Sequence, residues 1–210
     1  MNEKFFTLPI EKQQRILNAG YRVFSQNSYK KSPVGEIASE AGISKSLLFH
    51  YFRNKKELYF FLWDEAVKLT MQYLTEYRCY EPTDLFEMMR RGMKAKLALM
   101  ALYPDLTMFV MKAFYEKEPE IAVEIQKSYQ NVRGQSIRSS FEKLNPADFR
   151  DGLDLEMMHQ EMYWASAGYL WEIIQRQEPL DIAKLEADFT KLLKFWKQIY
   201  GKDQGKDETR

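Results

Sequence analysis

Residues 34–52 constrain the fold of this chain more than any other segment of its sequence. The pattern predicts two short helices, one over residues 34–40 and one over residues 44–52. Between them, Gly42 can adopt the left-handed backbone conformation that a helix exit needs, and Ser44 is a favoured N-cap residue. Two short helices joined by such a turn are typical of a helix-turn-helix.

Helical periodicity also dominates the rest of the chain, and no segment alternates like a strand for long. Nine glycines and seven prolines are few for 210 residues, which opposes a turn-rich all-β fold. We therefore predict an all-α fold of about nine helices. Their expected ranges are 10–26, 34–40, 44–52, 54–78, 84–102, 105–117, 119–144, 154–177 and 181–200.

The net charge of +1 conceals an uneven distribution of charge along the chain. The first 60 residues contain ten Lys/Arg and five Asp/Glu, whereas the remaining residues contain 21 and 25. A basic N-terminal part on a mildly acidic body favours contact with a polyanion. A solvated surface on which charges cluster by chance is the alternative.

The composition also predicts the compartment in which the protein works. No apolar run approaches the roughly 18 residues of a membrane span. The N-terminal stretch MNEKFFTLPIEKQQ lacks the apolar region of a signal peptide. Cys79 is the only cysteine, so an intrachain disulfide cannot form. We therefore expect a cytoplasmic protein without a membrane partner.

A helical wheel of the second short helix divides its side chains between two faces. At about 100° per residue, Leu48 and Phe52 point to the core. The opposite face can meet the major groove, with hydroxyl and imidazole groups for base edges and apolar groups for thymine methyls. The residues expected on this face or at its rims are Lys45, Ser46, Leu47, Phe49, His50 and Tyr51.

Phosphate contacts are expected at the two sides of this surface. Asn54 can cap the fourth helix, with Glu57 in the capping-box position. Lys55 lies in the first turn of that helix, where the dipole already favours an anion. Tyr51 can reach a phosphate, and Ser32 precedes the second helix and could hold the other strand.

The stretch IASEAGISKSLLFHYFRNKKELYFFL resembles the DNA-binding signature of the tetracycline-repressor (TetR) family of bacterial transcription regulators. The resemblance covers about the first quarter of the chain. Phe49 stands where the family usually has Tyr, and Leu47 where a small or polar residue is common. The matching residues are Ile37, Ala38, Ala41, Gly42, Ser44, Leu48, Tyr51, Phe52, Lys55 and Leu58.

The resemblance implies a helical C-terminal domain for ligand binding and dimerisation. We therefore expect a helix-turn-helix domain over residues 1–53, a ligand-binding and dimerisation domain over 54–200, and a polar tail over 201–210. It also implies that the last two helices form a four-helix bundle with their copies in a homodimer. Such a dimer places two reading helices about one DNA turn apart, which matches a palindromic operator.

The two C-terminal helices carry apolar residues at spacings that suit such a bundle. The last helix has a heptad-like seam, and the helix before it is apolar on two sides and needs two partners. An ordinary intramolecular core is the alternative. The residues expected at the dimer interface are Trp164, Gly168, Trp171, Leu185, Phe189, Leu192 and Trp196.

The middle helices are rich in Met, Phe and Tyr, which favours a pocket for a lipophilic or aromatic ligand. Core packing is the alternative for every one of these residues. Arg133 and His159 are the polar candidates that could orient a ligand. The expected pocket residues are Met89, Met93, Phe109, Tyr129, Arg133, His159 and Tyr163.

Catalytic and metal sites are not predicted. Glu156 and His159 have the spacing of a carboxylate di-iron helix, but that chemistry needs a second copy, and His50 is the only other histidine. We find no zinc-ligand set or glycine-rich phosphate loop, and expect no cofactor. Cys79 is either a redox sensor or, as is more usual, a small buried hydrophobe.

Taken together, these patterns predict a DNA-binding transcription regulator, not an enzyme. We expect a repressor that leaves double-stranded operator DNA when an unidentified small effector binds the middle helices and tilts the fourth helix. The alternative is an all-helical enzyme or carrier of a lipophilic small molecule whose basic N-terminus is incidental.

Overall fold

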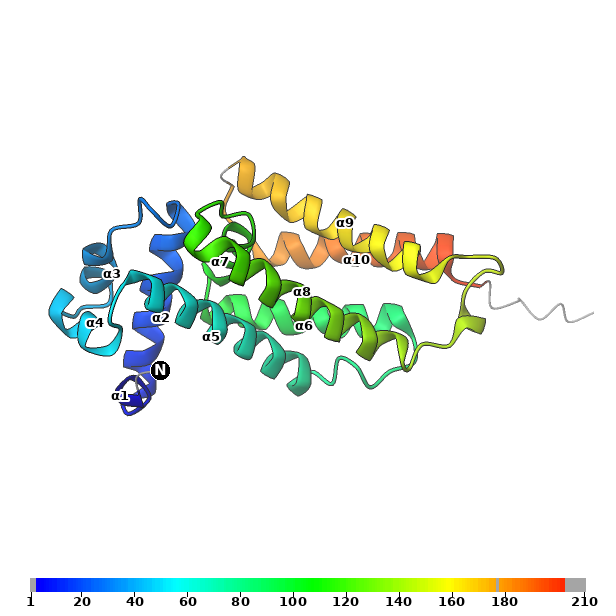
Figure 1. The fold of residues 1–210 in the computed structure, drawn as a ribbon. Coiled ribbons are helices and arrows are strands. Elements are labelled where there is room, and N and C mark those ends of the chain that lie inside the picture. Colours follow the sequence, from blue (N-terminus) through cyan, green and yellow to red (C-terminus); the bar gives the residue numbers. More distant parts are fainter. Residues whose placement is uncertain (1–2, 177, 203–210) are drawn as a thin grey trace, which may run out of the picture. The chain divides into compact units, whose positions relative to one another are not determined.

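The computed structural model describes residues 3–176 and 178–202, and these residues are mainly helical (Figure 1). Every predicted helix is present, and the described helix ends lie within about one turn of the expected positions. The expected helix end at residue 177 and residues 203–210 of the predicted polar tail lie outside the described residues. In the described residues, extended pairing is limited to an isolated bridge between Phe149 and Gly201. The helices are α1 (Glu3–Phe6), α2 (Ile10–Gln26), α3 (Val34–Glu40), α4 (Lys45–Tyr51), α5 (Lys55–Glu76), α6 (Leu85–Leu102), α7 (Leu106–Phe114), α8 (Pro119–Phe141), η1 (Pro146–Asp148), α9 (Leu155–Gln175) and α10 (Ile182–Tyr200).

The short elements α1 and η1 were not predicted. A segment of three or four residues is too short to show helical periodicity, so only its caps could reveal it. For η1 that cap exists, because the Asn145 side chain accepts a hydrogen bond from the backbone N–H of Ala147 at 3.2 Å. For α1 there is no such signal: Pro9 is the N-cap residue of α2 and does not indicate that another helix precedes it.

The chain forms two compact units. The first comprises Met1–Gln72 and Ala98–Gln135, and the second comprises Tyr73–Leu97 and Ser136–Arg210. The first unit therefore contains the helix-turn-helix together with α7 and most of α5 and α8. This division does not coincide with a boundary at residue 53, and the functional division expected there stays a prediction.

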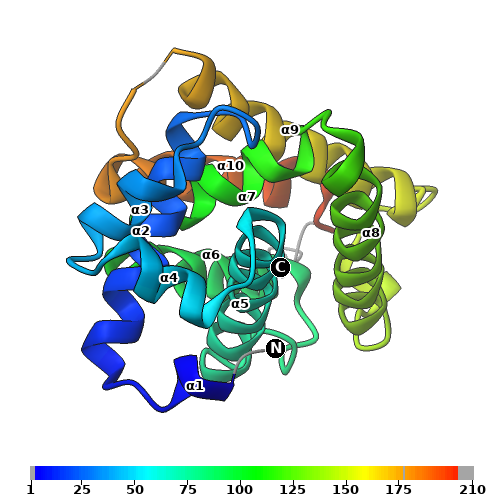
Figure 2. The same ribbon diagram turned by 60° about the vertical axis from the view of Figure 1, so that its left-hand side comes forward.

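In the first unit, α2 packs closely against α5. The backbone at Gly20 allows this approach, because a Cβ there would lie 2.6 Å from Cδ1 of Leu62. The Tyr21 hydroxyl donates a hydrogen bond to the carbonyl of Leu62 at 3.2 Å. The aromatic rings of Phe24 and Phe109 lie 6.2 Å apart and bring α7 against α2. Figure 2 shows α2, α3 and α4 grouped around the start of α5.

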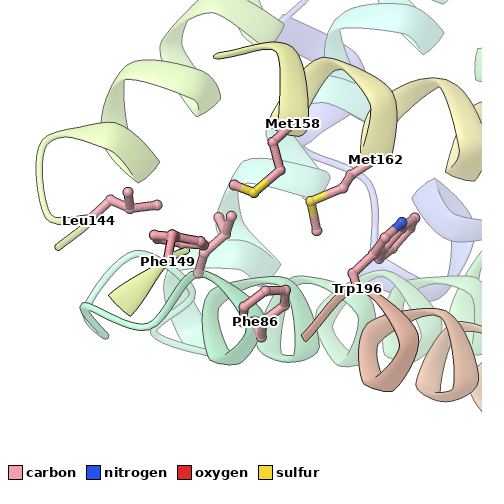
Figure 3. Close-up of a cluster of buried hydrophobic side chains, with 7 residues drawn as sticks. Phe86, Leu144, Phe149, Met158, Met162 and Trp196 are labelled. Carbon is pink, nitrogen blue, oxygen red and sulfur yellow. The ribbon is translucent and has the colours of Figure 1, made fainter. Parts of the chain in front are cut away.

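The second unit has its own core, built from α6, α9, α10 and the segment after α8 (Figure 3). In that view, Met158 and Met162 of α9 point into the cluster, Met158 on the side of Leu144 and Phe149 and Met162 toward Phe86 and Trp196. Backbone hydrogen bonds tie the end of α10 to the segment after η1, since the N–H of Arg150 donates to the carbonyl of Tyr200 at 3.0 Å. The core residues are Leu85, Phe86, Leu144, Phe149, Met158, Met162 and Trp196.

Among the described residues, no single helix is long and apolar enough to cross a membrane. The pair formed by α6 and α7 would meet the length and composition of a span, but the chain bends by 109° between the two helices.

Candidate DNA-binding interface

The turn between α3 and α4 has the hydrogen bonds of a Schellman motif. The N–H of Ile43 donates to the carbonyl of Ala38 at 2.9 Å, and the N–H of Gly42 donates to the carbonyl of Ser39 at 3.0 Å. Gly42 has φ +68°, the left-handed conformation that glycine adopts without strain. The predicted role of Gly42 in the turn is confirmed, and α4 can begin immediately afterwards.

The start of α4 is fixed by the predicted N-cap. The Ser44 hydroxyl accepts a hydrogen bond from the backbone N–H of Leu47 at 3.1 Å, and it lies 2.9 Å from the Ser46 hydroxyl. Leu48 and Phe52 are buried, as the helical wheel predicted. This burial sets the rotation of α4 about its axis and therefore determines which side chains face outward.

The outward face of α4 carries most of the predicted reading residues. Lys45, Ser46, Phe49 and His50 are exposed, and Leu47 is partly exposed. The Lys45 ammonium lies 5.9 Å from the centre of the Phe49 ring, a cation–π contact that holds both side chains on the same side. The face thus combines a cation, a hydroxyl, an imidazole and an aromatic edge on one short helix.

Two predicted phosphate contacts are turned into the protein. Tyr51 is buried, with its ring 6.3 Å from the ring of Phe5 in an edge-on contact. Ser32 is also buried, and its hydroxyl donates to the carbonyl of Ser28 at 2.9 Å. The wheel placed Tyr51 at a rim because it did not include α1, which covers that side. These placements argue against a phosphate contact by the Ser32 side chain. A phosphate contact by Tyr51 stays a prediction.

The start of α5 is capped almost as predicted. The Asn54 side chain accepts from the N–H of Glu57 at 2.8 Å, which confirms the cap. The Glu57 carboxylate returns to the N–H of Arg53 at 3.1 Å, one residue earlier than in a standard capping box. The first interaction satisfies an N–H group that the first turn of a helix leaves unpaired, and the second pairs the N–H of the residue before the cap. Together they fix the direction in which the chain enters α5.

Lys55 lies in this first turn but directs its charge toward its own protein. Its ammonium donates to the carbonyl of Lys30 at 3.0 Å and lies 5.0 Å from the centre of the Tyr29 ring. Partial burial lowers the pKa of Lys55, and the nearby Glu120 opposes that shift. A phosphate contact by Lys55 therefore competes with these internal interactions, and it stays a prediction.

An acidic segment that joins α7 to the first turn of α8 lies close to Lys30 and Lys55. We call Glu116, Glu118 and Glu120 the acidic bridge. The Glu116 carboxylate accepts from the N–H of Tyr29 at 2.7 Å, and Glu118 forms an ion pair with Lys30 at 3.5 Å. Burial and then Glu120 raise the pKa of the Tyr29 hydroxyl to about 12. Through these contacts with Tyr29 and Lys30, the acidic bridge holds the loop between α2 and α3 in place.

The predicted pocket residues are distributed over both units. Phe109 is buried among the rings of Tyr21, Phe24 and Tyr59, so it serves the core of the first unit. The Tyr129 ring packs in a tilted orientation against the ring of Phe114, with ring centres 4.4 Å apart, also in the first unit. Arg133 also belongs to the first unit. The second unit contains Met89, Met93, His159 and Tyr163, and Met89 packs against its core.

A cavity of about 350 Å³ lies along α8 in the first unit. It is open to solvent, and its lining residues are Glu124, Lys127, Ser128, Asn131, Val132 and Gln135. None of the predicted pocket residues lines it, although Tyr129 and Arg133 are neighbours of these residues in the sequence. The assignment of the ligand-binding residues therefore stays a prediction.

The predicted dimer residues do not share one face. Leu185 and Trp196 are buried within their own chain, and Leu192 packs on the core of the second unit. Trp164 is 58% exposed and Gly168 is exposed, whereas Trp171 and Phe189 are partly buried. Leu185, Leu192 and Trp196 of α10 therefore contribute to an intramolecular core, whereas α9 directs Met158 and Met162 inward and Trp164 outward. The assignment of the dimer-interface residues stays a prediction.

Reactive chemistry has little support in the described residues. They contain no group of three or more His, Cys, Asp or Glu that could hold a metal ion. Cys79 is buried, its thiol donates to the carbonyl of Met88 at 3.3 Å, and burial raises its pKa. A thiol with a raised pKa carries little thiolate, which disfavours a redox-sensing role.

Comparison with known proteins agrees with this geometry. The sequence model described as "Bacterial regulatory proteins, tetR family" matches residues 16–60, which run from α2 into α5. A transcriptional regulator of Shigella flexneri, AcrR, is 29% identical over 80 residues, 38% of this chain and 37% of that protein. A fatty acid metabolism regulator protein of Bacillus subtilis is 21% identical over 185 residues, 87% and 93% of the two chains.

Solved structures share the fold. FadR of Bacillus halodurans, described as a fatty acid degradation regulator, has a TM-score of 0.61 and 20% identity, covering 85% of this chain and 96% of that chain. A TetR family regulator of Chloroflexus aurantiacus has a TM-score of 0.56 and 18% identity, covering 95% and 98%. Residues 16–60, with the outward-facing α4, thus match the DNA-binding segment of the tetR family of bacterial regulatory proteins, and the chain shares the fold of solved TetR family regulators.

Proposed function

We propose that this chain is a homodimeric repressor that holds palindromic operator DNA in the cytoplasm and releases it on binding a lipophilic ligand. The observation that carries the DNA-binding part is the division of α4, with Leu48 and Phe52 buried and Ser46, Phe49 and His50 outside. Such a helix can enter a major groove without exposing the core. The role requires no catalytic residue.

The homodimer is supported by apolar side chains that the chain itself leaves uncovered. Met157 and Trp164 on α9, and Ile182 and Phe195 on α10, are exposed within the second unit. Large exposed apolar groups on neighbouring helices are typical of an interface. A two-fold axis through this surface would pair each helix with its copy and present two copies of α4 to one operator.

The class of ligand is supported by the relatives. The Bacillus subtilis relative, aligned over 93% of its length, is a fatty acid metabolism regulator protein, and the solved structure of LfrR from Mycobacterium smegmatis holds proflavine. We propose an effector with a long acyl chain for this protein, because Met and aromatic residues are frequent in its middle helices. A planar aromatic cation such as proflavine is the second candidate.

Selection of bound sites from a random pool of duplexes tests the proposal most directly. We expect an enriched palindrome whose half-sites are separated by about one helical turn, and binding that weakens steeply with salt. Palmitate or proflavine added to the complex should then release the selected duplex. Enrichment of no sequence would overturn the DNA-reading role, and release by neither compound would overturn the proposed effectors.

A further inference from the structure

Helix α1 packs against the C-terminal end of α4 through Phe5. This side chain is 1% exposed, and its ring centre lies 4.8 Å from Phe61, 5.6 Å from Phe52 and 6.3 Å from Tyr51. Phe52 and Tyr51 belong to the end of the helix-turn-helix, and Phe61 to α5. Phe5 therefore fills the corner at which α4 turns into α5, and it fixes α1 beside the reading helix.

The chain between α1 and α2 is held in place by its own side chains. The Thr7 hydroxyl donates to the carbonyl of Lys4 at 2.8 Å, and the Gln13 amide donates to the carbonyl of Leu8 at 2.8 Å. These bonds link α1 to the first turn of α2. The position of Lys4 is consequently set by the fold and not only by its own rotamer.

Lys4 lies beside a predicted reading residue. Its ammonium is 3.3 Å from Nε2 of His50, and both side chains are exposed. An ammonium group has donors only, so Nε2 of the imidazole accepts this hydrogen bond and the ring proton lies on Nδ1. The contact therefore selects one tautomer and one orientation of His50, and it adds a positive charge where α4 ends.

Two lysines thus bracket the exposed face of α4. Lys45 is the first residue of the helix, and Lys4 approaches its last turn at His50. Phosphates line both edges of the major groove that a reading helix enters, and lysine meets them as a point charge. Residues 44–52 by themselves supply a cation at only one end of this face.

We propose that α1 is part of the DNA interface, with Lys4 as a phosphate contact that also orients His50 and with Phe5 as its positioning residue. This proposal rests on DNA reading by α4. Its two components differ in what they predict: the charge of Lys4 should add affinity for any duplex, whereas its orientation of His50 should add affinity only for the operator.

The test uses Lys4→Gln with Lys127→Gln as its matched control. Lys127 is an exposed lysine on α8, so its substitution makes the same change of charge away from α4. Fluorescence anisotropy would measure binding of the full-length protein to the selected operator and to a scrambled duplex between about 50 and 200 mM salt. We expect Lys4→Gln to lower the slope of log K against log salt by about 0.9 on both duplexes.

The orientation of His50 is tested by the double variant. Lys4→Gln should weaken operator binding roughly tenfold, more than scrambled-duplex binding, because it also releases the imidazole. In a His50→Gln background the loss should become equal on both duplexes. Lys4→Arg should retain the slope, and melting temperatures should be unchanged, which excludes loss of the fold.

The outcomes separate this inference from the proposed function. If Lys4→Gln behaves like Lys127→Gln while the parent still prefers the operator and responds steeply to salt, the inference is wrong and the proposed function stands. If the losses of Lys4→Gln and His50→Gln simply add on the operator, the orienting role is wrong. A parent protein that binds no duplex overturns both.

Discussion

At the scale of single residues, the backbone conformation of Gly42 allows the turn that connects α3 to α4. Gly42 stands in the left-handed region, and a Cβ there would meet no atom within 4 Å, so its constraint is conformational and not steric. Gly35 lies inside α3, and a Cβ there would also meet nothing. The two positions therefore isolate backbone conformation, because neither substitution changes a packing contact.

Substituting these glycines should have opposite effects on stability. Gly42→Ala should lower the free energy of unfolding by about 1 kcal/mol, because an L-residue is strained at φ +68°. Gly35→Ala should raise it by about 0.5–1 kcal/mol, because alanine loses less entropy than glycine in a helix. Urea unfolding of both variants measures the difference, and a stabilising Gly42→Ala would contradict the role of the turn.

At the scale of helices, periodicity and capping residues predicted α2 to α10 well. Ser44 and Asn54 form the side-chain caps expected of them, and Leu48 and Phe52 face inward as expected. These features depend on residues close in sequence, so local pattern suffices. The burial of Tyr51 was missed because it depends on Phe5, which is distant in sequence and lies on a helix too short to show a period.

Helix α6 contains an ion cluster whose pH dependence follows from its charges. Glu87 accepts hydrogen bonds from Arg90 and then Arg91, which lower its pKa from 4.5 to about 2. A carboxylate with a depressed pKa stabilises the folded state above its unfolded pKa and loses that contribution as pH falls toward the folded pKa. The relevant window is therefore pH 4.5 to about 2.

Glu87→Gln should accordingly be destabilising near neutral pH by about 0.5 kcal/mol, the typical size for partly exposed helix pairs. The difference from the parent should shrink as pH falls below 4.5. Chemical denaturation at pH 7, 5, 4 and 3 would measure it. A gap that widens toward acid pH would show that the cluster does not stabilise the fold in its charged form.

The ion pair between the acidic bridge and Lys30 leads to a prediction about DNA affinity. Glu118→Gln removes the ion pair with Lys30, and that lysine then becomes available to a DNA phosphate. We expect duplex affinity to rise about two- to fivefold at low salt, with a smaller gain at high salt because the charges are screened. Glu142→Gln, at an exposed position beyond the end of α8, is the matched control and should have no such effect. An unchanged affinity would mean that Lys30 faces away from DNA.

At the scale of the whole molecule, the sequence could predict that the last two helices bury apolar faces but not against which partner. The spacing of Leu185, Leu192 and Trp196 suits an intermolecular bundle and an internal core equally well. The structure buries Leu185 and Trp196 inside one chain. The candidate dimer surface is instead marked by Trp164 and Phe195, of which Phe195 lies outside the predicted seam.

Trp164→Glu should therefore convert the proposed dimer to a monomer. A charge at the centre of an apolar interface costs several kcal/mol, enough to raise the dimer dissociation constant by about a hundredfold or more. Light scattering during gel filtration measures the mass. Val123→Glu, at an exposed apolar position on α8, should leave the mass unchanged. A Trp164→Glu protein that stays dimeric would place the interface elsewhere.

The burial of two tryptophans has a consequence for how this protein unfolds. Trp63 is enclosed in the first unit, where its indole N–H donates to Ser128 at 2.9 Å, and Trp196 is enclosed in the second. Trp63 thus reports on the first unit, and Trp196 reports on the second when Trp164 and Trp171 of that unit are replaced by Phe. Because α5, α6 and α8 continue across the boundary between the units, loss of one unit removes turns from helices of the other. If the two units unfold cooperatively, the fluorescence of both tryptophans should change at the same denaturant concentration.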